Sequence, residues 1–245
     1  MYSELQNTTC LLAPDTIFGP YDVNGELHRH DVREDEEGIN LYLDLGLIDV
    51  ETCEPLPNAW ITIWACNATG TYSGYTGIDP NTVSVLPGWS TREDGTTDDE
   101  TFLRGISKTN DAGIAEFLTV FPGYYDSRTT HIHVAVQSNV LAPYHAHLST
   151  LNRTLNSEDS VYSVANADRY SAIISTELVG EILADGLIGY ITIGVNKSAS
   201  AIATVGTQVN VQGYIPTVSL TSGAQAAANT KDPPEGYRAN GMRKL

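Results

Sequence analysis

The part of the chain that decides the fold is residues 121–136, which read Phe-Pro-Gly-Tyr-Tyr-Asp-Ser-Arg-Thr-Thr-His-Ile-His-Val-Ala-Val. Its second half alternates in the manner of a β-strand, so His131 and His133 project from the same face. Two imidazoles on one face can bind one metal ion from the same direction. The pattern therefore predicts a strand that begins at His131 and a metal site beside it.

A turn before this strand carries two tyrosines. Pro122-Gly123 is a turn signal, so Tyr124 and Tyr125 are expected in a loop that folds back over the strand, where one phenol can reach the same ion. A His-x-His pair alone is weak evidence, because most such pairs are surface or hydrogen-bonded histidines. The chain has two more, at 28–30 and 145–147, and the first lies among charged residues and is interpreted as a solvated loop.

A second segment, residues 60–74, also leads to a tyrosine. Residues 60–64 are aromatic and β-branched and predict a strand, and turn-forming residues follow from Asn67 to Gly70. Small residues flank Tyr72, which predicts an accessible hydroxyl group. From the spacing alone, a tyrosine that packs on the turn is the more common arrangement.

Together these segments resemble the intradiol ring-cleavage dioxygenases, most closely the secreted intradiol dioxygenase-like proteins of fungi and arthropods. The resemblance covers about residues 10–194 and consists of short motifs in a fixed order. The motifs are Trp64 to Gly74 with Gly70-Thr71-Tyr72-Ser73-Gly74, Arg104-Gly105 to Gly113, Pro122 to Tyr125, and Arg128 to His133, supported by Phe18-Gly19-Pro20-Tyr21 and Asp185 to Ile191.

The resemblance implies an Fe(III) cofactor and a reaction in which O2 cleaves a catechol between its two hydroxyl-bearing carbons, giving a cis,cis-muconate. The four iron ligands of the family fall on Tyr72, Tyr125, His131 and His133, with Tyr125 and His131 axial. Tyr125 is preferred to Tyr124 because the family ligand stands three residues after the proline. Tyr125 is also the ligand that substrate displaces, and it then acts as a base.

The resemblance assigns a further role to Arg128, which matches the arginine that lies over the substrate ring and stabilises negative charge. Without that role, Arg128 would form a surface ion pair. The bacterial enzymes carry a glutamine on the strand after the two histidines, and residues 144–150 contain none. His147 is the candidate to bind substrate instead, and a solvated His147 is an equal alternative.

Fe(III) is also favoured by the chemistry of these side chains. Phenolate is a hard, anionic oxygen donor that suits a trivalent ion, and two phenolates with one hydroxide balance its charge inside a cavity. A zinc site more often recruits cysteine or carboxylate. A bound cation lowers the tyrosine pKa from its usual value of about 10, and tyrosinate bound to iron should colour the protein.

Composition limits the alternatives. The 245 residues, 41% of them hydrophobic, suffice for one domain with extensions. The 13 Lys and Arg against 30 Asp and Glu give a net charge of −17, so neither nucleic acid nor an anionic membrane surface is an expected partner. No apolar run is long enough to predict a transmembrane helix. The chain has three cysteines, Cys10, Cys53 and Cys66. They allow at most one internal disulfide, and the sequence does not decide which two are paired.

Glycosylation sequons favour a secreted protein. They begin at Asn7, Asn67, Asn152 and Asn196. The first residues do not form a signal peptide, so we expect a mature form with an added methionine. The sequon at Asn67 lies close to Tyr72, and we expect it to be unmodified or turned outward.

The predicted fold is an all-β sandwich, because short strands separated by turn signals recur and no apolar stripe of helical period appears. Further strands are expected at 41–50, 60–65, 113–120, 172–178, 189–195 and, as a candidate, 205–218. Residues 76–101 are predicted to be a long active-site loop. The expected organisation is an N-terminal arm at 1–38, a catalytic β-sandwich domain at 39–220 and a flexible tail at 221–245, in a monomer or homodimer.

Two other functions fit parts of the sequence. One is a non-catalytic β-sandwich module that binds iron or catechols, which the missing glutamine would explain. The other is a zinc or copper hydrolase or oxidase that uses the His-x-His pairs. The colour of the protein and its oxygen uptake distinguish these functions from a dioxygenase.

Overall fold

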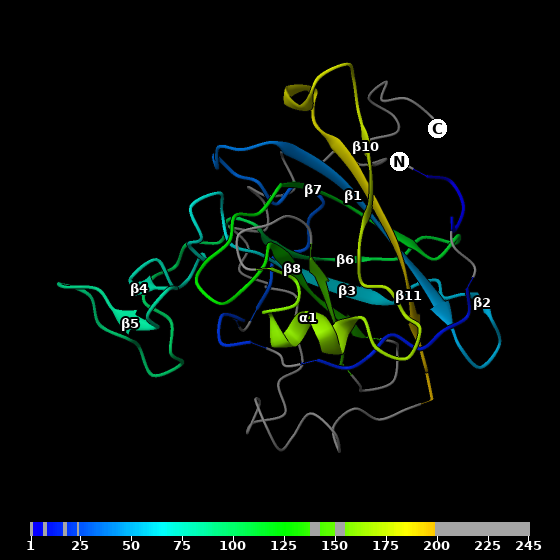
Figure 1. The fold of residues 1–245 in the computed structure, drawn as a ribbon, viewed down its shortest axis with the longest axis horizontal. Helices are drawn as coiled ribbons and strands as arrows, with labels where there is room; N and C mark the ends of the chain where they lie inside the picture. Colours follow the sequence, from blue (N-terminus) through cyan, green and yellow to red (C-terminus); the bar gives the residue numbers. More distant parts are fainter. Residues whose placement is uncertain are drawn as a thin grey trace.

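The computed structural model describes residues 2–6, 9–16, 19–23, 25–137, 143–149 and 155–198, with only the backbone of 137 and 143–149. Its elements are almost all strands, arranged as two packed sheets (Figure 1). The predicted all-β sandwich is confirmed. The candidate strand at 205–218, the tail at 221–245 and the sequon asparagines Asn7 and Asn152 lie outside the described residues.

The first sheet is centred on β1 (Asn40–Asp49). On one side β1 runs parallel to β11 (Leu187–Val195), which pairs with β10 (Ser175–Leu178). On the other side β1 is antiparallel to β7 (Ile114–Val120) and to the short β2 (Glu54–Pro55). The central strand of this sheet therefore pairs with a segment 146 residues away in the sequence, which no local pattern predicts.

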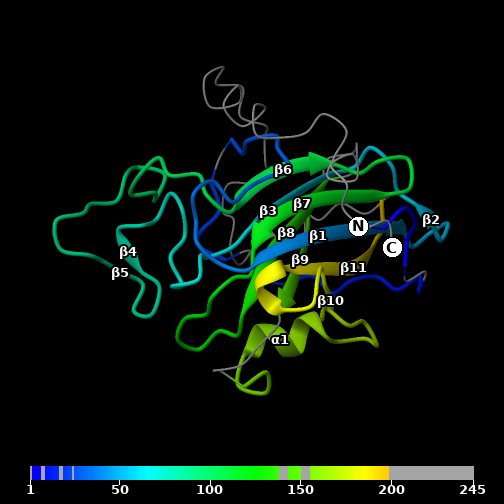
Figure 2. The same ribbon diagram turned by 90° about the horizontal axis from the view of Figure 1, so that it is seen from above.

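The second sheet carries the site. Its order is β6 (Arg104–Lys108), β3 (Trp60–Trp64), β8 (His131–Gln137) and β9 (Pro143–Ser149), all antiparallel. Figure 2 shows the layers from above. Between β3 and β6, the predicted long loop contains a small hairpin of β4 (Ile78–Asp79) and β5 (Ser84–Val85) that projects from the body.

The sequence did not predict the helix α1 (Ser160–Ala165), which lies in a segment that reads as polar turns. Six residues are too few to show a helical apolar period. Asp159 caps the helix by accepting hydrogen bonds from the backbone N–H groups of Val161 and Tyr162. The strand expected at 172–178 is shorter, beginning at Ser175, and a 3₁₀ turn η1 (Leu183–Asp185) precedes β11.

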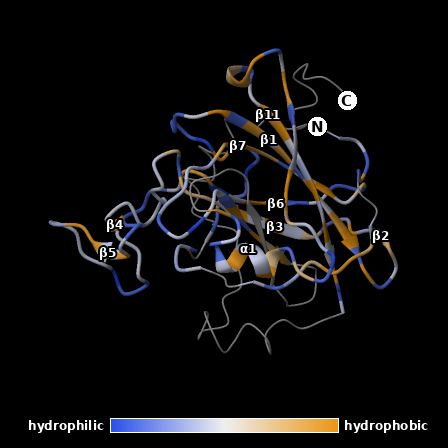
Figure 3. Ribbon diagram, in the orientation of Figure 1, coloured by the Kyte–Doolittle hydropathy of each residue, from blue (hydrophilic) through white to orange (hydrophobic). Residues whose placement is uncertain are grey.

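The core lies between the sheets and is formed by alternate residues of each strand. Hydrophobic residues follow the strands of both sheets in Figure 3. The central members are Leu43, Leu45, Leu47, Ile61, Ile63, Phe117, Ile132, Val134, Ile191 and Ile193. A disulfide joins Cys10 to Cys53 at one end of β1, and Cys66 is a buried thiol. Within the described part of the chain, no helix is long and apolar enough to cross a membrane.

The interpretation of residues 28–30 as a solvated loop was wrong. His28 and Asp31 form backbone bridges to Ile106 and Leu118, so this part of the arm lies along the sheets. Arg29 is buried, donates hydrogen bonds to backbone carbonyls and pairs with Glu34. The charged residues here are partly paired with one another, which the composition of the segment does not reveal.

Candidate metal centre

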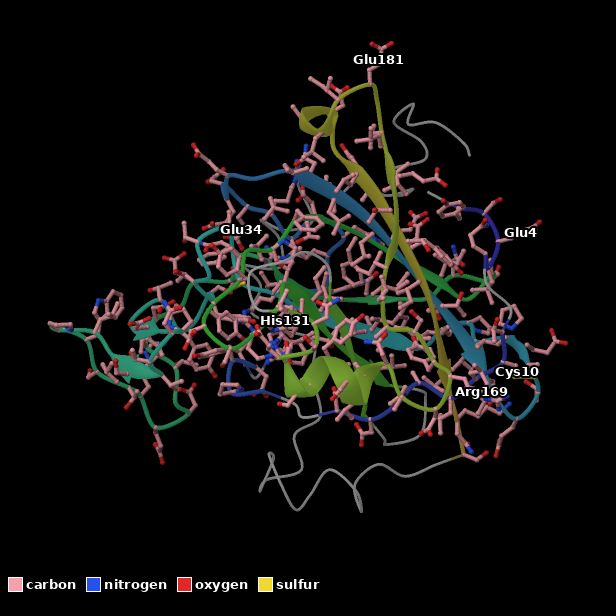
Figure 4. The ribbon with its side chains drawn as sticks, viewed as in Figure 1. Glu4, Cys10, Glu34, His131, Arg169 and Glu181 are labelled. Carbon is pink, nitrogen blue, oxygen red and sulfur yellow. A yellow bond between two sulfur atoms is a disulfide. The ribbon has the colours of Figure 1, made fainter. Side chains whose placement is uncertain are left out.

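Strand β8 separates the core from the candidate site. Ile132, Val134 and Val136 point into the core, and alternation therefore turns His131 and His133 to the other face of the sheet. His133 stands opposite Trp64 of β3, and the two rings stack with centroids 4.8 Å apart. His131 lies inside the molecule (Figure 4). Neither imidazole is open to solvent, since each residue is 2% exposed.

Two loops bring tyrosines to these histidines. Tyr72 follows the turn after β3, and Tyr125 belongs to the loop before β8. The Tyr72 Oη lies 3.2 Å from the Nε2 atoms of both His131 and His133 and 3.4 Å from the Tyr125 Oη. The Tyr125 Oη is 3.2 Å from His131 Nε2, which is 3.2 Å from His133 Nε2. Four donor atoms from three segments thus meet at one point.

The structure corrects the predicted exposure of Tyr72. Its residue is only 2% exposed, because Tyr21 of the N-terminal arm stacks on its ring with centroids 4.5 Å apart. Small neighbours in sequence do not expose a side chain when a distant segment covers it. The choice between the adjacent tyrosines agrees with the geometry, since Tyr124 is 39% exposed while Tyr125 is 8% exposed and reaches the cluster.

Burial determines the protonation of the phenols when no cation is near. It raises the pKa of Tyr72 well above the usual value, and the neighbouring Tyr125 raises it further. Burial also raises the pKa of Tyr125 to about 12, although the Arg128 guanidinium acts in the opposite direction. Both side chains are therefore neutral phenols at pH 7 unless a cation stabilises the phenolates.

A hydrogen bond orients His131 for metal binding. Its Nδ1 lies 2.6 Å from the carbonyl oxygen of Thr129. A carbonyl oxygen can only accept, so Nδ1 carries the proton and Nε2 presents its lone pair to the phenols and to His133. This arrangement is typical of a histidine ligand, whose second ring nitrogen is held by a backbone carbonyl.

The spacing of the four atoms fits one ion. Donors about 2.1 Å from a common ion are about 3.0 to 3.5 Å apart when they subtend about 90 to 110°, and the distances here are 3.2 to 3.4 Å. Elsewhere among the described residues, no three His, Cys, Asp or Glu side chains form a metal site. The donor set consists of oxygen and nitrogen atoms without carboxylate or thiolate, which is the set expected for Fe(III) rather than zinc.

No protein-family model matches the chain, and no curated protein matches its sequence. Among solved structures, an intradiol ring-cleavage dioxygenase from the mite Tetranychus urticae is similar, with a TM-score of 0.64 and 28% identity over 78% of this chain and 97% of that one. The fold of the chain is that of the intradiol ring-cleavage dioxygenases.

Solved structures of lower sequence identity share the same fold. Catechol 1,2-dioxygenase from Acinetobacter sp. ADP1 matches with a TM-score of 0.57 and 18% identity, over 85% of this chain and 68% of that one. Hydroxyquinol 1,2-dioxygenase from Pseudomonas putida DLL-E4 matches with a TM-score of 0.55 and 16% identity, over 75% and 66%.

Arg128 is held beside the cluster by an acidic partner. Its Nε lies 3.1 Å from a carboxylate oxygen of Asp159, the cap of α1, and its side chain is 15% exposed. The same carboxylate accepts the N–H of Thr129, two residues before His131. Burial opposes ionisation of Asp159, but the Thr129 N–H and Arg128 outweigh it and lower the pKa of Asp159. The ion pair is therefore partly buried rather than a surface pair.

His147 is placed only by its backbone. In the register of β8 and β9 it stands opposite His133, so it belongs to the part of the sheet that carries the site. Its side chain lies outside the described residues. The structure therefore neither brings His147 to the substrate side of the cluster nor removes it.

Two further residues, Arg104 and Tyr21, support the site, although the sequence alone did not assign them to it. Arg104 is 1% exposed and donates hydrogen bonds to the Ser73 hydroxyl and carbonyl and to the Tyr21 carbonyl. It also pairs with Glu26, whose pKa burial raises to about 7 although Arg104 lowers it. Arg104 thus ties the arm that covers Tyr72 to the residue next to Tyr72. Both Arg104 and Tyr21 stand in the quoted motifs, but their contacts are non-local.

Proposed function

We propose that this protein is a non-haem Fe(III)-dependent intradiol dioxygenase that uses O2 to cleave catechols between the two hydroxyl-bearing carbons. The observation that carries the proposal is the buried meeting of two phenols and two imidazoles within 3.4 Å. In this assignment Tyr72, Tyr125, His131 and His133 hold the iron. Similarity in fold to intradiol dioxygenases supports the same reaction class.

The charge of the site favours a trivalent ion. Ionising the buried Tyr72 and Tyr125 without a cation is unfavourable, as their raised pKa values show. Fe(III) with two phenolates and one hydroxide is neutral, which removes the cost of burying charge. The chemistry that Fe(III) supplies when bound is chelation of the two catechol oxygens and activation of the ring toward O2.

Tyr125 is the phenol suited to move a proton. Tyr72 is fixed by the Tyr21 ring on one side, whereas Tyr125 lies in a loop and is the more exposed of the two. Arg128 favours its anionic form. We therefore assign to the Tyr125 Oη, in its phenolate form, the acceptance of one catechol proton, after which the neutral phenol leaves the cluster and makes room for the substrate.

Arg128 is assigned to the substrate ring. Its guanidinium pairs with Asp159 and influences the ionisation of Tyr72 and Tyr125, so its field reaches the cluster. A fixed cation there stabilises the negative charge that a doubly deprotonated catechol brings. His147 is proposed as a second substrate contact, on the basis of its register position opposite His133.

The product of this reaction is a cis,cis-muconate-type dicarboxylate.

We also propose that the protein is secreted. The Cys10–Cys53 disulfide supports this, because such bonds persist mainly in oxidising compartments. The sequons point the same way.

The test is oxygen uptake with a panel of catechols, combined with the visible spectrum of iron-loaded protein. We expect a tyrosinate-to-iron band that shifts when catechol is added, followed by oxygen consumption. Tyr125→Phe should alter the band and slow turnover, while Tyr124→Phe at the exposed neighbouring residue is the matched control and should do neither. A coloured protein that binds catechol without oxygen uptake would be a binding module, and a colourless protein would reject both functions.

A further inference from the structure

Asn67 organises the turn that leads to Tyr72. Its Oδ1 accepts hydrogen bonds from the N–H groups of Thr69 (3.1 Å) and Thr71 (3.0 Å) and from the Thr69 hydroxyl. Its backbone N–H donates to the Thr71 carbonyl, and its carbonyl accepts the Gly70 N–H. Gly70 has a φ of 91°, which favours glycine. One asparagine therefore fixes the conformation of residues 67–71.

The chain repeats this turn far from the site. Asn110, between β6 and β7, accepts the N–H groups of Ala112 and Ile114 with its Oδ1. Its N–H donates to the Ile114 carbonyl, its carbonyl accepts the Gly113 N–H, and Gly113 has a φ of 74°. The two turns share their hydrogen-bond pattern and their glycine, so the second is an internal control for the first.

The Asn67 turn makes two contacts that the Asn110 turn lacks in the described part of the chain. The Asn67 Nδ2 donates to Glu36 Oε2 at 3.0 Å, which ties the turn to the N-terminal arm. The Asn67 carbonyl also accepts the N–H of Gly123 at 3.0 Å. Gly123 lies two residues before Tyr125, so this contact joins the loops of the two phenols.

The loops touch closely enough that a shift in one moves the other. A Cβ on Gly123 would stand 2.5 Å from the Ala68 carbonyl oxygen, and a Cβ on Gly70 would stand 2.9 Å from the Tyr124 carbonyl oxygen. Backbone therefore packs on backbone between the loops, and no flexible side chain can absorb a displacement. The position of the turn sets the position of Tyr125 relative to Tyr72.

We propose that Asn67 is a positioning residue that holds the Tyr72 and Tyr125 hydroxyls at the spacing of one metal ion. This inference rests on the proposed function, since it requires the phenols to be ligands. It needs an asparagine with an unmodified amide, because the Oδ1 orders the turn while the Nδ2 donates to a carboxylate. A glycan on Nδ2 would displace Glu36, so this sequon serves the structure rather than modification.

The key variant is Asn67→Asp, compared with Asn110→Asp. Each keeps the oxygen that orders its turn, but Asn67→Asp places a carboxylate against Glu36. We expect Asn67→Asp to shift the tyrosinate-to-iron band and to lower Fe(III) affinity, measured by competition with a chelator, by about tenfold or more. Asn110→Asp should leave both at the wild-type values. The melting temperatures of the apoproteins report any general loss of stability.

The double variant Asn67→Asp/Glu36→Gln reverses donor and acceptor in the same hydrogen bond and keeps the net charge. It should restore the band and the affinity to near wild type, which a loss of general stability would not predict. If Asn67→Asp does not fold, Asn67→Ser against Asn110→Ser makes the same comparison, because serine keeps a short acceptor but cannot reach Glu36.

Equal spectra and affinities for the Asn67 and Asn110 variants would overturn the inference, as would a double variant no better than Asn67→Asp. Wild-type protein that shows no tyrosinate-to-iron band would instead reject the proposed function. The two failures are therefore distinguishable.

Discussion

The two faces of β8 are equally buried, but one packs in the hydrophobic core and the other carries the candidate metal site. On the inner face, Ile132 and Val134 are 2% and 1% exposed and pack in the core between the sheets. On the outer face, His131 and His133 are each 2% exposed and meet two phenols. Burial alone thus does not separate stability from function. The difference is that apolar side chains are stabilised by leaving water, whereas buried polar ones need partners or an ion.

The largest effect on function is expected from removing a histidine on the outer face of β8. His133→Ala removes one of the four donors, so we expect loss of iron binding and of oxygen uptake, with folding retained because the core face is untouched. Iron content by atomic absorption and circular dichroism measure the two properties. A variant that keeps full iron content and turnover would show that His133 is not a ligand.

A substitution on the inner face of β8 should have the opposite effect, with a loss of stability and no loss of iron binding. Ile132→Ala opens a cavity in the core beside the histidines, and we expect the free energy of unfolding to fall by about 2 to 5 kcal/mol. Because the histidine positions follow the backbone of β8, the folded variant should keep the tyrosinate-to-iron band. Urea denaturation gives the stability. A band lost in the fully folded variant would mean that the faces are not separable.

Arg128 tests the electrostatics of the outer face. Arg128→Ala should reduce kcat by about 10²- to 10³-fold, because a preorganised cation near the developing charge is lost. Arg128→Lys should recover part of that loss, since it keeps the charge but not the Nε contact to Asp159. Iron content should not change. Equal kcat for the alanine variant and wild type would assign Arg128 to structure alone.

A smaller effect is expected on the pH dependence of stability, through Asp159, which pairs with Arg128. The pKa of Asp159 is lower in the folded protein, so its contribution to stability is fully present above its unfolded-state pKa of about 4 and is lost as pH falls through the folded value. We expect Asp159→Asn to flatten the decline of stability below about pH 4. Denaturation series across this pH range compare it with Asp126→Asn, an exposed control on the loop that carries Arg128, which should leave the decline unchanged. A decline as steep in Asp159→Asn as in wild type would contradict the assignment.

The sequence predicted the parts of this arrangement that are local or that stand in motifs. The alternation at 131–136 places His131 and His133 on one face, and the resemblance to the family motif, whose ligand stands three residues after the proline, selects Tyr125 over Tyr124. The cover of Tyr72 by Tyr21 and the parallel pairing of β1 with β11 depend on contacts between distant segments. Local residue types say nothing about such contacts.

Other elements were missed because their signals are short. Helix α1 has six residues, and its only clear mark is the cap Asp159. The pairing of Cys10 with Cys53 could not be chosen among three cysteines without coordinates. Asn67 was interpreted as a turn former and a sequon, and only its contacts with Glu36 and Gly123 reveal what the turn connects.

We propose that one ferric ion lies among Tyr72, Tyr125, His131 and His133. Diffraction from crystals of iron-replete protein at the iron absorption edge tests it directly. We expect one strong anomalous peak about 2 Å from each of the four donor atoms. No peak between these side chains, or a peak elsewhere in the molecule, would contradict it.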